Sequence, residues 1–342
     1  MKNVFYMNTI SSIGGCESFF YYLSKVYKDF VVMYKQGDPE QIKRLSKNIE
    51  VRKYKDKIVC DNFFCNYNFD VDVEAKNYYH IIHYDALNVK FTPMQKEDFK
   101  YIGVSKVACD SLKAVTGREC ELIYNEVPVK PKGLKKNKGL NLISCTRLTL
   151  EKGLDRIVKL SNALDKAGVE YTWTIYTNRT LKARTSIISP NVIVKEQQLD
   201  LYDEIEKSSY LVQLSDCESF GLSVCESLLL GTPVIITDIP AFREIGCTPE
   251  NAVFIDLEMK TIPIEEILAG KKKVVYSAPK SAWSKYLKKT SDYNPEDLIE
   301  VVAKKRYFDI DLQENIKRGQ VYKVKKCRAS YLESRDLVDI CD

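Results

Sequence analysis

The chain has no long apolar run, no CxxC cysteine pair and only two histidines. No stretch approaches the ~18 consecutive apolar residues of a transmembrane helix, which argues against a membrane-spanning segment. The N-terminal sequence MKNVFYMNTISSIGG is apolar from its start and lacks the basic-then-apolar order of a signal peptide. We therefore expect a cytoplasmic protein that begins with a buried strand.

Cysteine and histidine are arranged in a way that disfavours disulfides and metal. The eleven cysteines are an odd number and contain no CxxC pair, so reduced thiols are expected. Cys60, Cys65, His80 and His83 form C-x4-C-x14-H-x2-H, which is superficially close to a zinc finger. The last spacing is shorter than usual and the stretch has the pattern of consecutive strands. We therefore predict no metal site and no cofactor.

Length and charge suggest two domains with an uneven surface. The 342 residues, 45% hydrophobic and 29% charged, fit about two globular domains of roughly 150 residues. The net charge of +5 is concentrated, since residues 271–328 hold 16 Lys/Arg against 7 Asp/Glu, and 41–57 is also basic. These stretches are either solvated surface or attract phosphate of a nucleotide, an anionic membrane or a nucleic acid.

Apolar β-branched runs alternate with helical patterns along the chain, which predicts parallel sheets covered by helices. The segment PVKPKGLKKNKG at 128–139 is the expected boundary, and the strand–turn–helix pattern restarts after it. We predict an N-terminal Rossmann-like domain over 1–130, a linker over 131–139 and a second such domain over 140–320. A C-terminal helix at about 320–342 is expected to complete the first domain.

Three segments carry candidate ligand-binding residues. Gly14 and Gly15 follow the first expected strand and open a helix, where backbone amides can approach a phosphate. In LNLISCTRLTLEKGLDRIVKL, Arg147 and Lys152 lie between a strand and a helix and could clamp a diphosphate, or be solvated cations. In SDCESFGLSVCESLLLGTPVIITD, two acids suit hydroxyl recognition, although an acid is also favoured near a helix start. These acids are Glu218 and Glu226.

Taken together, these segments resemble the retaining glycosyltransferases of family 4, which have the two-domain GT-B architecture. TRLTLEKGLDR resembles the family's donor-phosphate segment, and ESFGLSVCE followed by GTPVIITD resembles its E-x7-E motif. The resemblance is strongest over about 141–246. It implies transfer of a sugar from a nucleotide diphospho-sugar, with UDP favoured, to an acceptor hydroxyl with retention at the anomeric carbon.

The resemblance also implies roles for single residues. Arg147 and Lys152 would bind the donor diphosphate, Glu226 the ribose hydroxyls, and Glu218 the transferred sugar. Further donor-side positions follow from it: Gly14, Gly15, Glu244 and the backbone of Phe220, Gly221 and Leu222. YIGVSKVACDSL resembles the family's inter-domain serine segment and puts Ser105 on the acceptor side. Glu126 replaces the glycine usual after Asn125, so Asn125 receives no role.

The two histidines are expected to differ. They are three residues apart in NYYHIIHYDALNVK and so fall on opposite faces of a strand. The family places a histidine after an N-domain strand near the sugar, which favours His83, with Asp85 beside it, as a catalytic-site residue. His80 is expected to be packed or partly exposed.

The expected partners are the nucleotide-sugar and a glycan or lipid-linked acceptor of polysaccharide biosynthesis. The basic segment around Arg52, Lys53, Tyr54 and Lys55 could touch anionic lipid, making the protein a peripheral membrane enzyme. Two other interpretations stay open: an inactive glycosyltransferase-like partner subunit and a nucleotide-sugar epimerase. Nucleic-acid binding is not expected, because the basic C-terminal third, including SAWSKYLKK and EDLIEVVAKKR, has helical patterns without an aromatic recognition module.

Overall fold

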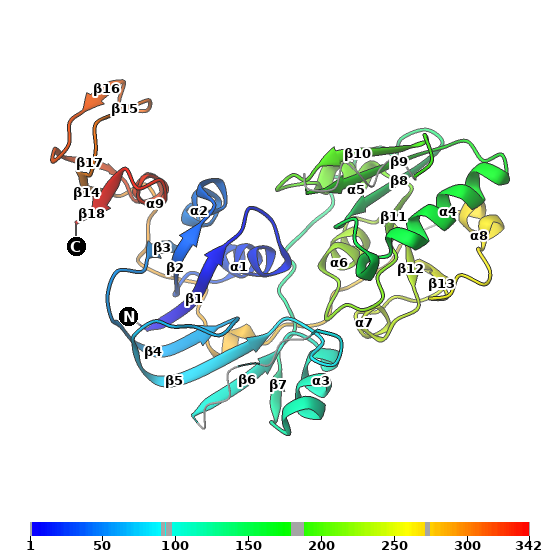
Figure 1. Cartoon of the computed structure of the whole chain (residues 1–342), viewed down its shortest axis with the longest axis horizontal. Coiled ribbons are helices and arrows are strands. Elements are labelled where there is room, and N and C mark those ends of the chain that lie inside the picture. The colour runs from blue at the N-terminus through cyan, green and yellow to red at the C-terminus, as the bar shows by residue number, and fades with distance from the viewer. Residues whose placement is uncertain (1, 90–92, 94–97, 179–187, 271–273, 342) are drawn as a thin grey trace.

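The computed structural model describes residues 2–89, 93, 98–178, 188–270 and 274–341. The chain forms two parallel α/β units and a small C-terminal module (Figure 1). Residues 271–273 of the basic stretch lie outside the described residues.

The first unit is a seven-stranded parallel sheet in the order β3-β2-β1-β4-β5-β6-β7. Its elements are as follows: β1 (Asn3–Ile10), α1 (Gly15–Val26), β2 (Val31–Gly37), α2 (Pro39–Ser46), β3 (Glu50–Lys53), β4 (Ile58–Cys65), β5 (Val73–Ile82), β6 (Phe99–Gly103), α3 (Lys106–Thr116) and β7 (Cys120–Leu122). Strands such as β1 are apolar on both faces because helices cover both sides of the sheet. Phe19, Phe20 and Leu23 of α1 pack on one face, and Ala108 and Leu112 of α3 pack on the other.

The second unit is a six-stranded parallel sheet in the order β10-β9-β8-β11-β12-β13. Its strands are β8 (Leu140–Cys145), β9 (Tyr171–Thr177), β10 (Val192–Glu196), β11 (Tyr210–Gln213), β12 (Val234–Thr237) and β13 (Ala252–Ile255). Its helices are the 3₁₀ turn η1 (Leu150–Lys152), α4 (Leu154–Lys166), α5 (Tyr202–Lys207), α6 (Leu222–Leu229), α7 (Pro240–Glu244) and α8 (Ile264–Ala269). The predicted doubly wound GT-B architecture is confirmed.

After α8 the chain returns to the first unit. Trp283, in the 3₁₀ turn η3 (Trp283–Lys285), is fully buried against it. Its ring centroid lies 5.9 Å from that of Phe5 and 5.5 Å from that of Phe19. This contact joins residues nearly 280 positions apart, so the returning segment belongs to the core of the first unit.

The C-terminal module consists of antiparallel strands and one helix. Its elements are β14 (Leu298–Ala303), β15 (Tyr307–Asp309), β16 (Glu314–Ile316), β17 (Val321–Lys325), α9 (Lys326–Ser334) and β18 (Val338–Ile340). The α9 hydroxyl of Ser330 donates to the Val51 carbonyl on β3 at 2.9 Å, so the module packs on the first unit.

This module corrects two expectations. The second unit ends well short of 320: Tyr276 still donates to the Ile245 carbonyl at 2.8 Å, but Trp283 already packs on the first unit. EDLIEVVAKKR was expected to be helical, but it contains β14, whose Val301 and Ala303 are buried and alternate with more exposed residues. β-Branched residues in this period-two pattern favour a strand. Likewise, SAWSKYLKK forms only the short turn η3.

Candidate active site

The candidate site lies at the point in the second sheet where the order of the strands reverses, between β8 and β11. β8 continues to β9 and β10 on one side, while β11 continues to β12 and β13 on the other. The loops after β8 and β11 therefore separate and leave a crevice at the carboxyl ends of these strands, where α/β proteins bind ligands. Arg147 and Lys152 follow β8, and Glu218 follows β11.

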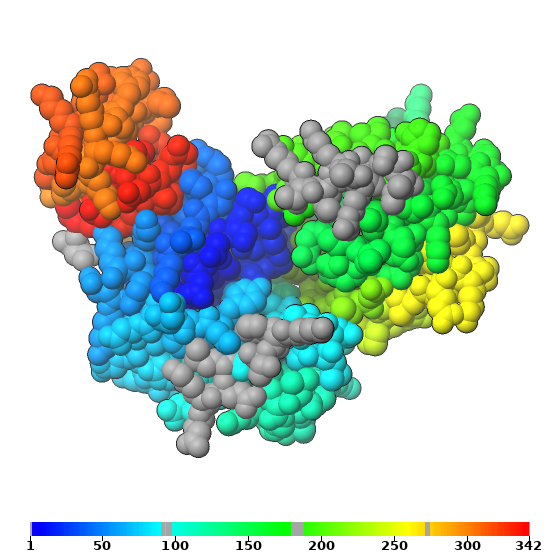
Figure 2. All heavy atoms as spheres, in the orientation of Figure 1, coloured from blue at the N-terminus to red at the C-terminus, as the bar shows by residue number. Residues whose placement is uncertain are grey.

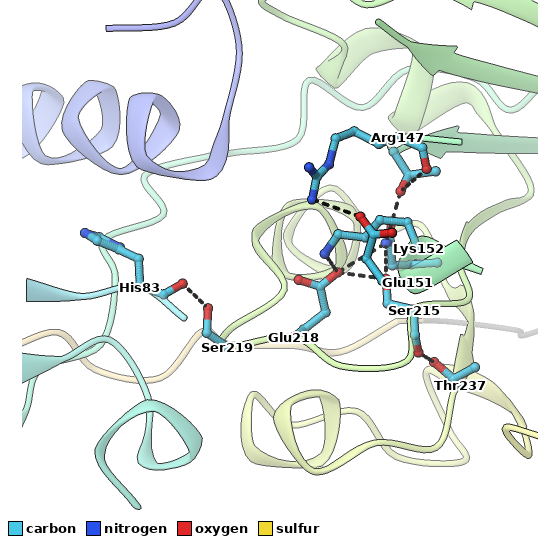
Figure 3. Close-up of polar contacts among 10 residues, drawn as sticks. His83, Arg147, Glu151, Lys152, Ser215, Glu218, Ser219 and Thr237 are labelled. Carbon is cyan, nitrogen blue, oxygen red and sulfur yellow. Dashed lines mark hydrogen bonds and ion pairs between the residues drawn. The ribbon is translucent and has the colours of Figure 1, made fainter. Parts of the chain in front are cut away.

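Glu218 is held by three donors that all reach one carboxylate oxygen (Figure 3). The Oε1 atom accepts from Lys152 Nζ at 2.7 Å, Ser215 Oγ at 2.8 Å and Gln213 Nε2 at 3.3 Å. The Oε2 atom accepts no hydrogen bond from the described residues. Both charged side chains are mostly buried, at 20% exposure for Lys152 and 17% for Glu218. The arrangement fixes one oxygen and leaves the other for a ligand hydroxyl.

Two contacts position the loop that carries Glu218. The buried Arg156 of α4 donates to the Leu214 carbonyl at 2.8 Å and pairs with Asp216. Thr237, at the end of β12, donates to the Ser215 carbonyl at 2.6 Å (Figure 3). Arg156 and Thr237 were not predicted as site residues, because their roles depend on contacts between loops that sequence spacing does not reveal.

Gly153 allows the β8 loop to approach the β11 loop closely. Its φ is +80°, in the left-handed region, and a Cβ there would lie 2.0 Å from the Leu214 carbonyl oxygen. Only glycine meets both demands. This close approach brings Lys152, on one loop, within reach of Glu218 on the other.

Arg147 lies at the rim of the site. Its guanidinium is 3.4 Å from Glu151 Oε1, and its side chain is 59% exposed. In Figure 3 it is separate from the Lys152–Glu218 pair. Arg147 is thus free to reach an anionic ligand, with only an exposed neighbouring acid to displace.

Glu226, on α6, faces the first unit and not the Glu218 cluster. Its Oε1 accepts from the Tyr22 hydroxyl of α1 at 2.6 Å, and that hydroxyl is 2.8 Å from the hydroxyl of Tyr202. Burial raises the pKa of Glu226 to about 7, although the Tyr22 hydrogen bond and the Arg44 charge oppose this shift. Glu226, which was predicted to bind the ribose hydroxyls, is therefore bridged to the opposite unit, and no sequence pattern indicates that bridge.

His83 is also at the junction of the two units. Its carbonyl accepts from Ser219 Oγ at 2.7 Å, while its ring lies 4.7 Å from the Phe19 ring and points away from Glu218 (Figure 3). Its Nε2 has no hydrogen-bond partner among the described residues, and burial lowers its pKa to about 3. Burial likewise lowers the pKa of His80, whose side chain is fully buried, to about 4. Both rings are neutral at physiological pH.

The glycine turn is lined by an acid. Gly14 precedes α1, which has no side-chain cap, and a Cβ on Gly14 would lie 2.3 Å from Glu17 Oε2. The other oxygen of Glu17 accepts from the Ser11 amide at 2.7 Å. No atom lies within 4 Å of a Cβ built on Gly15, so Gly15 borders open space. Glu17 was not predicted, although its position three residues after the turn is that of a capping acid.

The remaining predicted residues have structural partners. Ser105 caps α3 by accepting from the Ala108 amide at 3.0 Å. Glu244 reaches the same helix end from the second unit and accepts from the Lys106 amide at 2.5 Å. Asp85 accepts from the Leu87 amide at 3.0 Å and closes a turn after β5. These contacts bring Ser105 and Glu244 together between the units, away from Lys152.

The start of α6 adjoins the crevice. Gly221 has φ +87° and precedes a helix without a side-chain cap, so the first amides of α6, from Leu222 onward, are available to an anion. Phe220 is buried, with its ring 6.3 Å from that of Tyr124. Its side chain is therefore a core group, and only its backbone can serve a ligand.

Within the described ranges, no three His, Cys, Asp or Glu side chains are grouped so as to hold a metal ion. None of the described helices combines the length and apolar content needed to cross a membrane.

Two parallel α/β units with a crevice at the carboxyl ends of the second sheet form the GT-B architecture. Residues 128–262 match the family model described as glycosyl transferases group 1, so the chain contains such a domain. ORF330 of Acidianus filamentous virus 2, a protein named as a glycosyltransferase, is 29% identical over 210 residues. That match covers 61% of this chain and 53% of the viral protein, so the chain spans about half the length of that relative.

Solved structures share the fold. Anabaena Alr3699/HepE in complex with UDP and glucose superposes with a TM-score of 0.60 at 14% identity, covering 79% of this chain and 89% of that one. WaaG, a glycosyltransferase involved in lipopolysaccharide biosynthesis, superposes with a TM-score of 0.54 at 12% identity, covering 78% and 89%.

Proposed function

We propose that the chain is a retaining, metal-independent glycosyltransferase that moves a sugar from a nucleotide diphospho-sugar, with UDP as the nucleotide, to an acceptor hydroxyl. The observation that carries the proposal is Glu218, fixed through Oε1 by Lys152 and Ser215 with Oε2 left for a ligand. Support also comes from the group 1 domain and from the UDP bound by the HepE structure.

The donor diphosphate would lie between Arg147, Lys152 and the start of α6. Breaking the sugar–phosphate bond leaves negative charge on the diphosphate and positive charge on the sugar ring. The two cations and the free amides of α6 would stabilise the negative charge, and the Glu218 carboxylate would stabilise the positive charge. Lys152 would give up part of its contact with Glu218 in order to contact the phosphate. Lys152 would then balance the negative charge on the diphosphate, and Glu218 the positive charge on the sugar ring.

Retention follows, in this proposal, from attack on the face that the diphosphate leaves. The acceptor hydroxyl forms the new bond to the anomeric carbon, the bond to the diphosphate breaks, and the hydroxyl proton passes to a departing phosphate oxygen. NMR of the product's anomeric configuration tests retention, and an inverted product contradicts it. A glycosyl group trapped on Glu218 would contradict front-face attack in favour of a covalent intermediate.

The acceptor that we propose is a lipid-linked glycan or another precursor of cell-surface polysaccharide, bound by the first unit. The WaaG resemblance in fold supports this choice only at the level of architecture. Incubating enzyme and donor with lipid-linked and water-soluble glycans, and comparing product formation, distinguishes the two acceptor classes.

Calorimetric binding of UDP, GDP and ADP tests the donor site. We expect selective micromolar binding of one nucleotide, lost in Arg147→Ala/Lys152→Ala. Lys159→Ala/Lys166→Ala, which removes two exposed cations of α4, is the charge-matched control and should bind normally. If the folded wild type bound no nucleotide, the inactive-partner interpretation would replace this proposal. Donor turnover without acceptor would indicate an epimerase.

A further inference from the structure

The C-terminal module contains a hairpin, β15–β16, that exposes both apolar and basic side chains. Figures 1 and 2 show the module at the side of the first unit away from the second sheet, with β15 and β16 outermost. Three large apolar side chains in the hairpin segment 308–312 face solvent: Phe308 is 50%, Ile310 69% and Leu312 40% exposed. Apolar groups gathered at a projecting tip mark an interaction surface.

Basic residues bracket the same hairpin. Lys305 and Arg306 immediately precede β15, and Lys317 and Arg318 immediately follow β16; all four are exposed. No salt bridge joins any of the four to a carboxylate of the described residues, and the neighbouring Asp336 pairs with Lys304. The hairpin thus presents exposed apolar side chains above a positively charged base, with Asp311 and Glu314 also at its turn.

The acids of the hairpin are largely compensated from within the module. Asp309 is fully buried and lies 3.1 Å from an Arg328 nitrogen, and Asp311 lies 3.1 Å from another nitrogen of the same side chain. Glu314 is exposed and remains as the one uncompensated acid of the described hairpin. The net surface charge around the tip is therefore positive.

The basic segment expected to touch lipid differs from the hairpin in this respect. Arg52 lies 2.6 Å from Glu50, and Lys55 lies 3.1 Å from Glu333 and 3.6 Å from Asp339. Two of those acids belong to the C-terminal module, which neutralises this segment. The hairpin, in contrast, carries exposed cations without a salt bridge together with exposed apolar side chains.

We propose that the β15–β16 hairpin is a membrane-docking element that inserts Phe308, Ile310 and Leu312 into an anionic lipid surface. Charge complementarity selects this occupant, because the unpaired cations at the base of the hairpin match anionic headgroups and its exposed apolar side chains match the acyl chains beneath them. The inference deepens the proposed function, on which it rests for its purpose: docking through the first unit would bring the acceptor side of the enzyme to lipid-linked glycans.

Vesicle sedimentation tests the docking directly, with phosphatidylcholine vesicles that contain or lack phosphatidylglycerol. The wild type should bind only the anionic vesicles and be released by high salt. Arg306→Ser/Lys317→Ser/Arg318→Ser should weaken partitioning on the order of a hundredfold, since each cation near an anionic leaflet contributes about fivefold. Lys135→Ser/Lys159→Ser/Lys166→Ser removes equal charge from the linker and α4 and should bind as the wild type does.

Two further variants test whether the exposed apolar side chains of the hairpin insert into the lipid. Ile310→Ser should weaken binding about tenfold, since it removes one inserted aliphatic side chain, whereas Leu268→Ser, at an exposed leucine of α8, should not. Both native tryptophans, Trp173 and Trp283, are fully buried, so the emission of Ile310→Trp should shift to the blue only when anionic vesicles are added.

Three results would overturn the docking proposal: no binding of the wild type to anionic vesicles at low salt, unchanged binding of the charge variant, or an unshifted Ile310→Trp spectrum. UDP calorimetry on the same variants separates the two proposals. Hairpin variants that keep UDP binding but lose vesicles support docking, whereas a wild type that binds vesicles but no nucleotide contradicts only the proposed activity.

Discussion

At the scale of single residues, the Glu218 carboxylate has one oxygen that accepts from three side chains and another that accepts from no described residue. We expect Glu218→Gln to lower the rate of sugar transfer about a hundredfold or more, because an amide cannot stabilise positive charge on the sugar ring. Single-turnover kinetics at saturating donor measure this rate. UDP affinity should change little, since Lys152 remains.

Glu258→Gln provides the control for this substitution. Glu258 is exposed and pairs only with Lys260 among the described residues, so its loss should leave the rate within about twofold. A Glu218→Gln enzyme as fast as this control would show that the Glu218 charge takes no part in the transfer.

Glu226 provides a prediction about pH. Its folded pKa of about 7 lies above the ordinary value of 4.5, so between these values the folded protein holds a proton that the unfolded chain has released. The free energy of unfolding should therefore fall as pH rises from about 4.5 to about 7, by about 3 kcal/mol from this group, and level off above.

Glu226→Gln isolates that contribution, because the amide does not titrate. Denaturant unfolding of both proteins across this pH range should show the wild type losing stability relative to the variant as pH rises. A difference between the two proteins that stays constant with pH would mean that Glu226 has an ordinary pKa.

The sequence predicted single residues unevenly, for a physical reason. Lys152 and Glu218 follow strands that end at the same sheet edge, so the motif spacing sufficed to bring them together. Tyr22 and Ser219 bridge the two units, and their contacts depend on how the units meet. No local pattern encodes that arrangement, so these residues were missed.

At the scale of elements, the β8–α4 turn depends on Gly153. Gly153→Ala should lower the free energy of unfolding by about 2–4 kcal/mol, because a Cβ both strains the backbone at φ +80° and meets the Leu214 carbonyl. It should also weaken UDP binding, because the loops of Lys152 and Glu218 must separate. Urea unfolding and calorimetry measure the two effects.

Gly168→Ala is the matched control at the other end of α4. Gly168 has φ +67° but nothing within 4 Å of a built Cβ, so only the conformational strain of about 1 kcal/mol remains. Equal losses in the two variants would show that the approach to Leu214 is not tight.

Elements in the C-terminal third were predicted less well than those in the two sheets. The parallel strands are continuous apolar runs and stand out in the sequence, as in YLVQ of β11. In β14, the apolar residues Leu298, Val301 and Val302 also fit helical spacing. Pairing with β17 and β18 decides in favour of a strand, and these partners are distant in the sequence.

At the scale of the whole molecule, the two units meet through groups that the proposed donor would need. Tyr22 donates to Glu226 Oε1, and burial together with the Glu226 charge raises the pKa of Tyr22, so its hydroxyl remains a donor. Ribose hydroxyls would have to displace this bond. In this arrangement the junction of the units and the nucleoside site compete for one carboxylate.

Tyr22→Phe tests that competition. Without the hydroxyl, Glu226 is available to the ribose, and we expect UDP to bind about fivefold to tenfold more tightly, the equivalent of one hydrogen bond to a charged group. Tyr21→Phe is the neighbouring control, because the Tyr21 ring stacks against Arg44 at 3.4 Å while its hydroxyl has no hydrogen bond to a described residue. Weaker UDP binding by Tyr22→Phe would instead make the Tyr22 hydroxyl part of the nucleotide site, and the bridge to Glu226 would then orient the acid and not block it.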